Sequence, residues 1–284
     1  MNDQNANQWV VDATAESFQD DVFERSKSVP VVLDFWAEWC GPCRALGPVL
    51  YDLAKEYDGR IVVVKANTEE LQEQAMEFQV SSIPAVFGIV DGEVVDFFQG
   101  ALPPEQIREW LGGILSAGEL KNAQALESES PAEAEKAYRQ LLEQSPENAL
   151  ASIGLARSLI SQQADDEAKQ ILAALEARGF LEPEAQKVKA QLDLSEQSGG
   201  DVDAARQALV DDPDNFDKKL ELAKLLAGNE AYEESMDLAL ELVSADRQAT
   251  GEQARLLMIE VFQVLADDSE MVNTYRRRLS MALY

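Results

Sequence analysis

A nearly continuous apolar run, VPVVLDFW at Val29–Trp36, constrains the fold more than any other stretch of this sequence. Most of its residues are β-branched or aromatic, and such a run is typical of a strand that is buried on both faces. A second run of the same kind, IVVVK at Ile61–Lys65, predicts another buried strand. Strands that are covered on both faces need helices on each side, so we expect an α/β domain.

Strand and helix signals alternate along the chain as far as Leu115. Two further strands are expected at Ala85–Val90 and Glu93–Gln99, and Asp91-Gly92 between them favours a tight hairpin turn. Amphipathic helices are expected at Ser17–Arg25, Arg44–Tyr57, Glu69–Phe78 and from Pro103-Pro104 to about Leu115. These elements predict a mixed sheet with helices on both faces.

The pattern changes after Ala117, where strand signals end and Leu, Ala, Glu and Gln dominate at helical spacing. A trio of positions recurs 34 residues later and again 67 residues after that: Ala134/Tyr138/Leu141, Ala168/Leu172/Leu175 and Ser235/Ala239/Leu242. A period of about 34 residues is that of tetratricopeptide helix pairs. We therefore expect two domains, residues 1–117 and an all-α repeat domain at 118–284; a generic Ala/Leu-rich bundle is the alternative.

Composition excludes several classes of function. The formal net charge of −29 disfavours binding to nucleic acid or to an anionic membrane. The sequence has no histidine, which removes histidine bases and ligands, and its two cysteines supply only half a zinc site. We expect no metal and no cofactor. Met1–Gln8 shows no signal-peptide pattern, and no apolar run approaches the ~20 residues that span a bilayer, so we expect a cytoplasmic protein.

The two cysteines, Cys40 and Cys43, stand three positions apart, just ahead of a predicted helix. A thiolate at a helix N-terminus is stabilised by unpaired backbone N–H groups and by the helix dipole. Cys40 is therefore the candidate nucleophile, and we expect it to be reachable from solvent. Cys43 can resolve a mixed disulfide, and Gly41-Pro42 constrain the turn between them. A purely structural bridge is less favoured, because so short a loop restricts the unfolded chain little.

The segment DFWAEWCGPC, Asp34–Cys43, resembles the signature of thioredoxin, and the resemblance extends over about residues 9–115. It implies a cis bond at Ile83-Pro84 that faces the cysteines and lies where an extended substrate chain pairs. It also implies that Asp34 is a buried acid behind Cys43, able to relay a proton, with Lys65 beside it.

The resemblance further implies a substrate-binding rim formed by Trp39, Gly41, Pro42, Ile83 and Pro84, with Trp39 partly exposed. Trp36 is expected in the core instead. The sequence departs from the family after the cis-proline, where Ala85 replaces the usual Thr, and before it at Ser81-Ser82. These departures leave open whether the usual thioredoxin substrates and thioredoxin reductase are its partners.

The order of a thioredoxin-like domain, degenerate repeats and a tail ending YRRRLSMALY resembles the bacterial thioredoxin-like co-chaperone family known as CnoX or YbbN. This resemblance implies a redox-active co-chaperone that holds unfolding or oxidised client proteins, forms mixed disulfides with them and transfers them to the GroEL chaperonin. The alternatives are a general protein disulfide reductase that its repeats direct to one partner, and an adaptor with a vestigial redox domain.

The tail has two interpretations. It carries a basic cluster on an acidic chain, followed by apolar residues: Arg276, Arg277, Arg278, Leu279, Leu283 and Tyr284. It can be the last helix that caps the repeats, or, by the resemblance, the end that docks on the chaperonin. Both can hold, because a helix can pack on one side and bind a partner on the other.

Overall fold

The computed structural model describes residues 9–246, 248–265 and 269–283. The chain divides into two compact units, Met1–Asn148 and Ala149–Tyr284, and each is described by itself. The domain boundary predicted after Ala117 remains a prediction.

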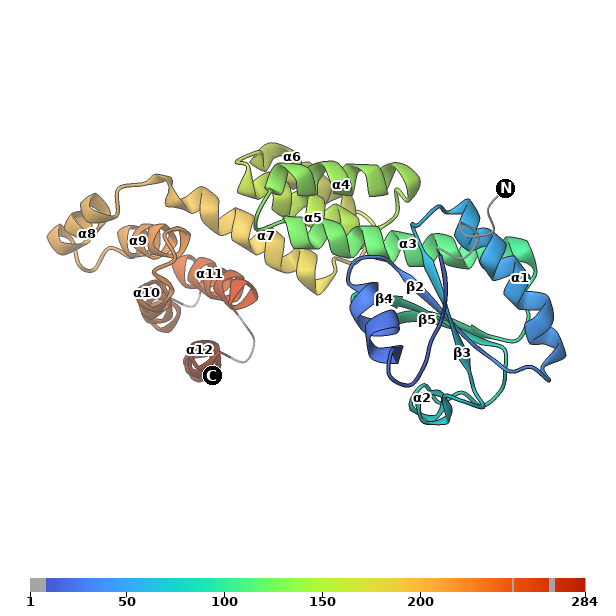
Figure 1. Ribbon diagram of the computed structural model, residues 1–284. Helices are drawn as coiled ribbons and strands as arrows, with labels where there is room; N and C mark the ends of the chain where they lie inside the picture. Colours follow the sequence, from blue (N-terminus) through green and yellow to red (C-terminus); the bar gives the residue numbers. More distant parts are fainter. Residues whose placement is uncertain (1–8, 247, 266–268, 284) are drawn as a thin grey trace. The chain divides into compact units, whose positions relative to one another are not determined.

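The first unit is built on a five-stranded sheet with the spatial order β1-β3-β2-β4-β5. Strands β2, β3, β4 and β5 of this sheet are labelled in Figure 1. The strands are β1 Val10–Asp12, β2 Val31–Trp36, β3 Val62–Asn67, β4 Ala85–Val90 and β5 Glu93–Gln99. β1, β3 and β2 run parallel, while β4 is antiparallel to both β2 and β5. The predicted mixed sheet is therefore confirmed, but β1 was not among the predicted strands.

Helices cover both faces of this sheet, as predicted. They are the π-helical turn η2 Gln19–Glu24, α1 Gly41–Glu56, α2 Gln72–Glu77 and α3 Pro104–Leu126, and a further helix of this unit, α4 Pro131–Gln144, packs on α3. On one face Val32 of β2 packs with Leu50 of α1 and Leu111 of α3. On the other face Phe35 packs with Phe18, which precedes η2, and with residues of α2. β2 thus buries side chains on both faces, which explains its nearly continuous apolar sequence.

Two local predictions have different outcomes. The Asp91-Gly92 turn is confirmed, because both residues have positive φ, 53° and 78°, as a tight hairpin between β4 and β5 requires. The helix expected to end near Leu115 instead continues to Leu126. Its second half contains no proline, and it is held by burial of Ala123 and by close packing of Gly118 on Pro30, where an added Cβ would lie 2.7 Å from Pro30 Cγ.

The second unit is helical, and no strand follows β5 in the described part of the chain. Its helices are α5 Ala149–Ser161, α6 Asp165–Glu176, α7 Pro183–Ser195, the 3-10 turn η3 Glu196–Gly199, α8 Val202–Asp211, α9 Phe216–Gly228, α10 Tyr232–Ala245, α11 Thr250–Val264 and α12 Glu270–Leu283. Successive helices pack against one another, α5 on α6 and α9 on α10, and α10 also contacts α11 and α12. None of the described helices is long and apolar enough to cross a membrane.

The recurring trio of positions marks the buried face of α4, α6 and α10. All nine residues expose 2% of their surface or less. In α10, the Ser235 hydroxyl donates a 2.7 Å hydrogen bond to the Ala223 carbonyl of α9 and so ties one helix to the next. The sequence period therefore identified the residues that pack between helices.

Candidate active site

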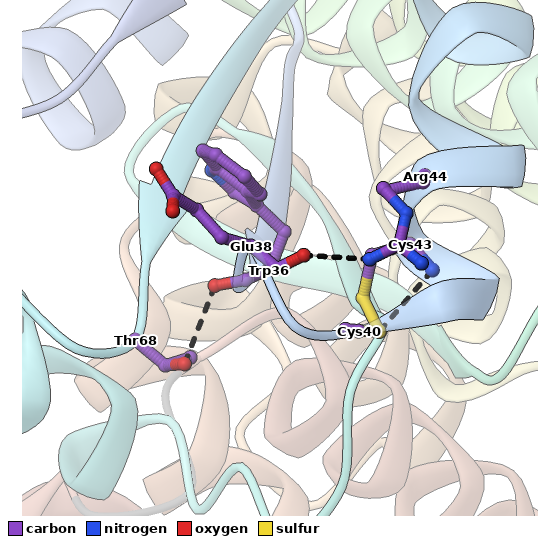
Figure 2. Close-up of a disulfide and its surroundings, with 6 residues drawn as sticks. All are labelled: Trp36, Glu38, Cys40, Cys43, Arg44 and Thr68. Atoms are coloured by element: carbon purple, nitrogen blue, oxygen red, sulfur yellow. Dashed lines mark hydrogen bonds between the residues drawn. A yellow bond between two sulfur atoms is a disulfide. The ribbon is translucent and has the colours of Figure 1, made fainter.

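The two cysteines form a disulfide at the N-terminus of α1, just after β2 (Figure 2). Cys40 is the N-cap residue, and the Cys43 backbone N–H lies 3.2 Å from its sulfur. The helix begins at Gly41, three residues before the predicted start, so Cys43 lies within its first turn. In this oxidised form Cys40 exposes 4% of its surface, so it is more deeply buried than we expected.

The local sequence favours a sulfur anion at this helix end. Pro42 lacks an N–H and fits the first turn, and no acidic side chain lies in that turn. Arg44 follows in the helix, and its Nη1 donates a 2.7 Å hydrogen bond to the Glu38 carbonyl (Figure 2). This bond fastens the loop before Cys40 to the helix. The unpaired N–H groups at this helix end stabilise negative charge on Cys40 when the disulfide is reduced.

Asp34 is a buried acid on β2, as the resemblance implied. It exposes 2% of its surface, and its Oδ1 has no hydrogen-bond partner among the described residues. Burial raises the pKa of Asp34 to about 7, and the positive charge of Lys65 opposes this increase. A carboxyl group with such a pKa can accept and return a proton near neutral pH.

Lys65 lies beside Asp34 in the sheet, since the two residues are register partners on β3 and β2. Its ion pair, however, is with Asp12 of β1, at 2.5 Å from Nζ to Oδ1. The ammonium also lies 4.9 Å from the centroid of the Trp36 ring. Sequence analysis missed Asp12 because it ends a strand of only three residues; the two valines before it were the available signal.

The peptide bond between Ile83 and Pro84 is cis, as expected, and the Pro84 carbonyl accepts a 2.8 Å hydrogen bond from the Gly100 N–H. Trp39 exposes 68% of its surface, and Gly41 and Pro42 are exposed beside it. Trp36 is only half-buried rather than part of the core. Contact of this rim with a client chain stays a prediction.

The tail forms α12, and one side of it packs on the repeat unit. Val272, Tyr275 and Leu279 are buried there, and Arg278 forms a 2.8 Å ion pair with Asp237 of α10. Arg276 stacks near the ring of Phe262, while Arg277 and Leu283 are exposed. The capping interpretation thus accounts for the buried side of the helix. Tyr284 lies outside the described residues.

No group of three or more Cys, Asp or Glu side chains in the described ranges is arranged to hold a metal ion. The site instead combines a mixed sheet, a disulfide at a helix N-terminus, a buried carboxyl and a cis-proline. Together these features define a thiol–disulfide exchange domain of the thioredoxin fold.

Comparison with known proteins agrees with this class. The thioredoxin family model matches residues 9–112, and two tetratricopeptide repeat models match residues 125–192 and 195–284. Thioredoxin C-2 of Corynebacterium nephridii is 38% identical over 102 residues, which are 36% of this chain and 93% of that protein. Thioredoxin 1 of Synechococcus elongatus is 44% identical over 94 residues, which are 33% of this chain and 83% of that protein.

The chain therefore belongs to the thioredoxin family through its N-terminal domain, and tetratricopeptide repeats follow that domain. The cysteine pair supports thiol–disulfide exchange, and the repeats support interaction with other proteins.

Proposed function

We propose that this protein is a redox-active co-chaperone, which exchanges disulfides with client proteins through Cys40 and Cys43 while its repeats hold them. One observation carries the proposal: a disulfide at a helix N-terminus in a thioredoxin domain shares a chain with two tetratricopeptide regions. The repeats supply an interaction surface beyond the one that a thioredoxin domain has alone.

The exchange starts from the dithiol form. The Cys40 thiolate attacks one sulfur of a client disulfide, a bond forms between Cys40 and that sulfur, and the other client sulfur leaves as a thiolate that takes up a proton. Cys43 then loses its proton, attacks the Cys40 sulfur and displaces the remaining client thiolate. Two electrons pass to the client, and the protein is left with the Cys40–Cys43 disulfide.

Asp34 is the group proposed to accept the Cys43 proton. It is buried on β2, on the sheet face that α1 covers, and its pKa near 7 matches proton transfer at neutral pH. The disulfide must then be reduced again, and a dithiol-generating reductase such as thioredoxin reductase is the proposed electron donor.

The holding function is proposed to use apolar surface rather than thiols. Large apolar side chains are exposed on both units, among them Trp39 and Met76 on the first, and Phe180 and Val210 on the second. Transfer of clients to the GroEL chaperonin in the cytoplasm, with α12 as the docking element, extends the proposal from the family resemblance. The exposed outer side of α12, with Arg277 and Met281, is compatible with it.

A trapping experiment tests the covalent step. In the Cys43→Ser variant the mixed disulfide on Cys40 cannot be resolved within the chain, so client-linked species should accumulate in lysate and disappear on addition of dithiothreitol. The Cys40→Ser, Cys43→Ser double variant is the control and should capture none. If the trap accumulates no linked species, disulfide exchange with clients is excluded.

The second candidate is a general disulfide reductase, favoured by the complete thioredoxin-type site and by the thioredoxins that match it. The two candidates differ in how the double variant should act on an aggregating model protein. A co-chaperone should still suppress aggregation without its cysteines, because binding unfolded chains needs apolar surface. A reductase should show little suppression even as wild type.

A further inference from the structure

Three charged residues lie in one row across the parallel strands of the sheet. Lys65 of β3 is the register partner of Asp12 on β1 and of Asp34 on β2. The residues two positions earlier, Val63, Val10 and Val32, all belong to the core beneath α1 and α3. Because side chains alternate along a strand, all three charged side chains point to that same face.

Lys65 stands between two carboxylates but pairs with one. Its Nζ lies 2.5 Å from Oδ1 of Asp12, and no ion pair or hydrogen bond joins it to Asp34 in the described part of the chain. The Asp12 side chain is 69% exposed and that of Lys65 is 18% exposed, whereas Asp34 is fully enclosed. The Trp36 ring of β2, 4.9 Å from Nζ, gives the ammonium a second contact.

Solvation explains why Lys65 pairs with Asp12 and not with Asp34. An ion pair with exposed Asp12 lets both charges keep part of their hydration, so it costs little. Pairing with Asp34 would bring the ammonium into the closed interior, where the desolvation cost can exceed the attraction. The face of the Trp36 ring attracts the ammonium as well, so Lys65 has two stabilising contacts without an ion pair to Asp34.

We propose that Asp12 is a positioning residue. It holds the Lys65 ammonium away from Asp34, so that no ion pair forms between Lys65 and the buried Asp34 carboxylate. In the oxidised and the reduced protein alike, this arrangement keeps Asp34 a stronger base than a salt-bridged carboxylate would be. The functional consequence rests on the proposed function, since it assumes that Asp34 takes the Cys43 proton.

The other groups that face Asp34 do not supply the positive charge that Lys65 supplies. α1 contributes the phenol of Tyr51, whose own pKa is raised by burial and by the charges of Asp34 and Asp12, so the phenol stays neutral. β4 carries the sequence AVFGIV, and α3 contributes apolar residues to this side of the core. Lys65 is the positive charge that lowers the pKa of Asp34, and Asp12 governs where that charge sits.

The test is the titration of Asp34 in the full-length Asp12→Asn variant. NMR of the Asp34 carboxyl carbon monitors the titration in the disulfide form, where neither cysteine titrates. Without the Asp12 charge, Lys65 can turn toward Asp34, and the pKa of Asp34 should fall by about 1 unit. The matched control is Asp52→Asn, which removes an exposed charge from α1 that pairs with Lys55 and should leave the titration unchanged.

A second pair of variants shows whether Asp12 acts through Lys65. In a Lys65→Met background, Asp12→Asn should shift the Asp34 titration much less than it does when Lys65 is present. An unchanged titration in Asp12→Asn overturns the proposal, and so does an equal shift with and without Lys65, because Asp12 would then act directly.

A separate experiment measures function, as the rate at which Cys43 resolves a preformed mixed disulfide on Cys40. In Asp12→Asn the pH profile of this rate should move to lower pH together with the Asp34 titration. At pH 6 a one-unit shift gives about fivefold more of the ionised Asp34. If the titration moves and the pH profile does not, the positioning role of Asp12 stands and the proton-relay role of Asp34 fails.

Discussion

The first unit keeps a buried carboxyl group of which one oxygen has no partner among the described residues, whereas the second satisfies its buried hydroxyls. Asp34 lies in the sheet with Oδ1 unpaired. In the repeats, Ser158 donates to the Gly154 carbonyl at 2.9 Å and Ser235 donates to Ala223 of the neighbouring helix at 2.7 Å. An unpaired buried group costs stability, whereas a hydrogen-bonded hydroxyl does not. The contrast separates one buried group that is proposed to react, Asp34, from hydroxyls that serve packing.

The largest expected effect concerns the reactive cysteine pair of the first unit. Cys40→Ser should reduce the rate of insulin disulfide reduction in the presence of dithiothreitol to the background rate, because Cys40 is the proposed first nucleophile and Cys43 the resolving cysteine. Thermal unfolding of the variant, measured against reduced wild type, should change little. Residual reduction well above background would show that Cys43 can act as the first nucleophile.

The next effect concerns packing alone. Leu242→Ala should lower the free energy of unfolding of the repeat unit by about 3 kcal/mol, because it opens a cavity in a fully buried position of α10. Urea denaturation followed by circular dichroism measures the change. Exposed Leu256→Ala on α11 is the control and should cost far less. Insulin reduction should stay at the wild-type rate; a parallel loss would contradict the separation of the two regions.

A pH-dependent effect tests how much the buried, unpaired Asp34 lowers the free energy of unfolding. The folded pKa of Asp34 is raised from 3.8 to about 7, so the neutral form favours folding, and stability falls as pH rises through this interval. Asp34→Asn should therefore be more stable than wild type at pH 8, by a few kcal/mol, on the order of 3. Near pH 4 that gain should disappear. Urea denaturation at both values checks the sign, and an equal difference at both would contradict the assigned pKa.

The smallest effect tests the satisfied hydroxyl. Ser235→Ala removes one hydrogen bond between α10 and α9, and it should lower the free energy of unfolding by about 1 kcal/mol at any pH. Chemical denaturation at pH 5 and pH 8 makes the comparison with Asp34→Asn direct. A pH-dependent change in Ser235→Ala would remove the contrast between the two kinds of buried group.

Sequence analysis predicted most of the sheet and the buried side of the repeats, because both depend on local periodicity. β2 and β3 were visible as apolar runs, and the trio around Leu172 and Leu242 marked helix positions that are indeed buried. β1 was missed because three residues are too few to show alternation. The end of α3 was misplaced because tertiary contacts, such as Gly118 on Pro30, extend a helix beyond its apolar pattern.

The candidate site likewise has features that the sequence predicted and features that it did not. The cysteines, the cis bond at Pro84 and the buried Asp34 were all named from the motif and its resemblance, and the structure contains them. Lys65 was expected to be the partner of Asp34, and its ion pair with Asp12 was not predicted, since Asp12 lies 53 residues away in sequence. Nor was the half-exposed Trp36, whose ring contacts Lys65.

By itself, the sequence determined the class of this protein: a buried parallel strand that leads into two cysteines, followed by helices at a repeat period. Those features are local, since adjacent residues and fixed spacings encode them. Only the tertiary structure decided which of two carboxylates Lys65 pairs with and how deeply Cys40 is buried. Such choices depend on strand register and on the solvation of each charge, and neither exists until distant segments have packed together.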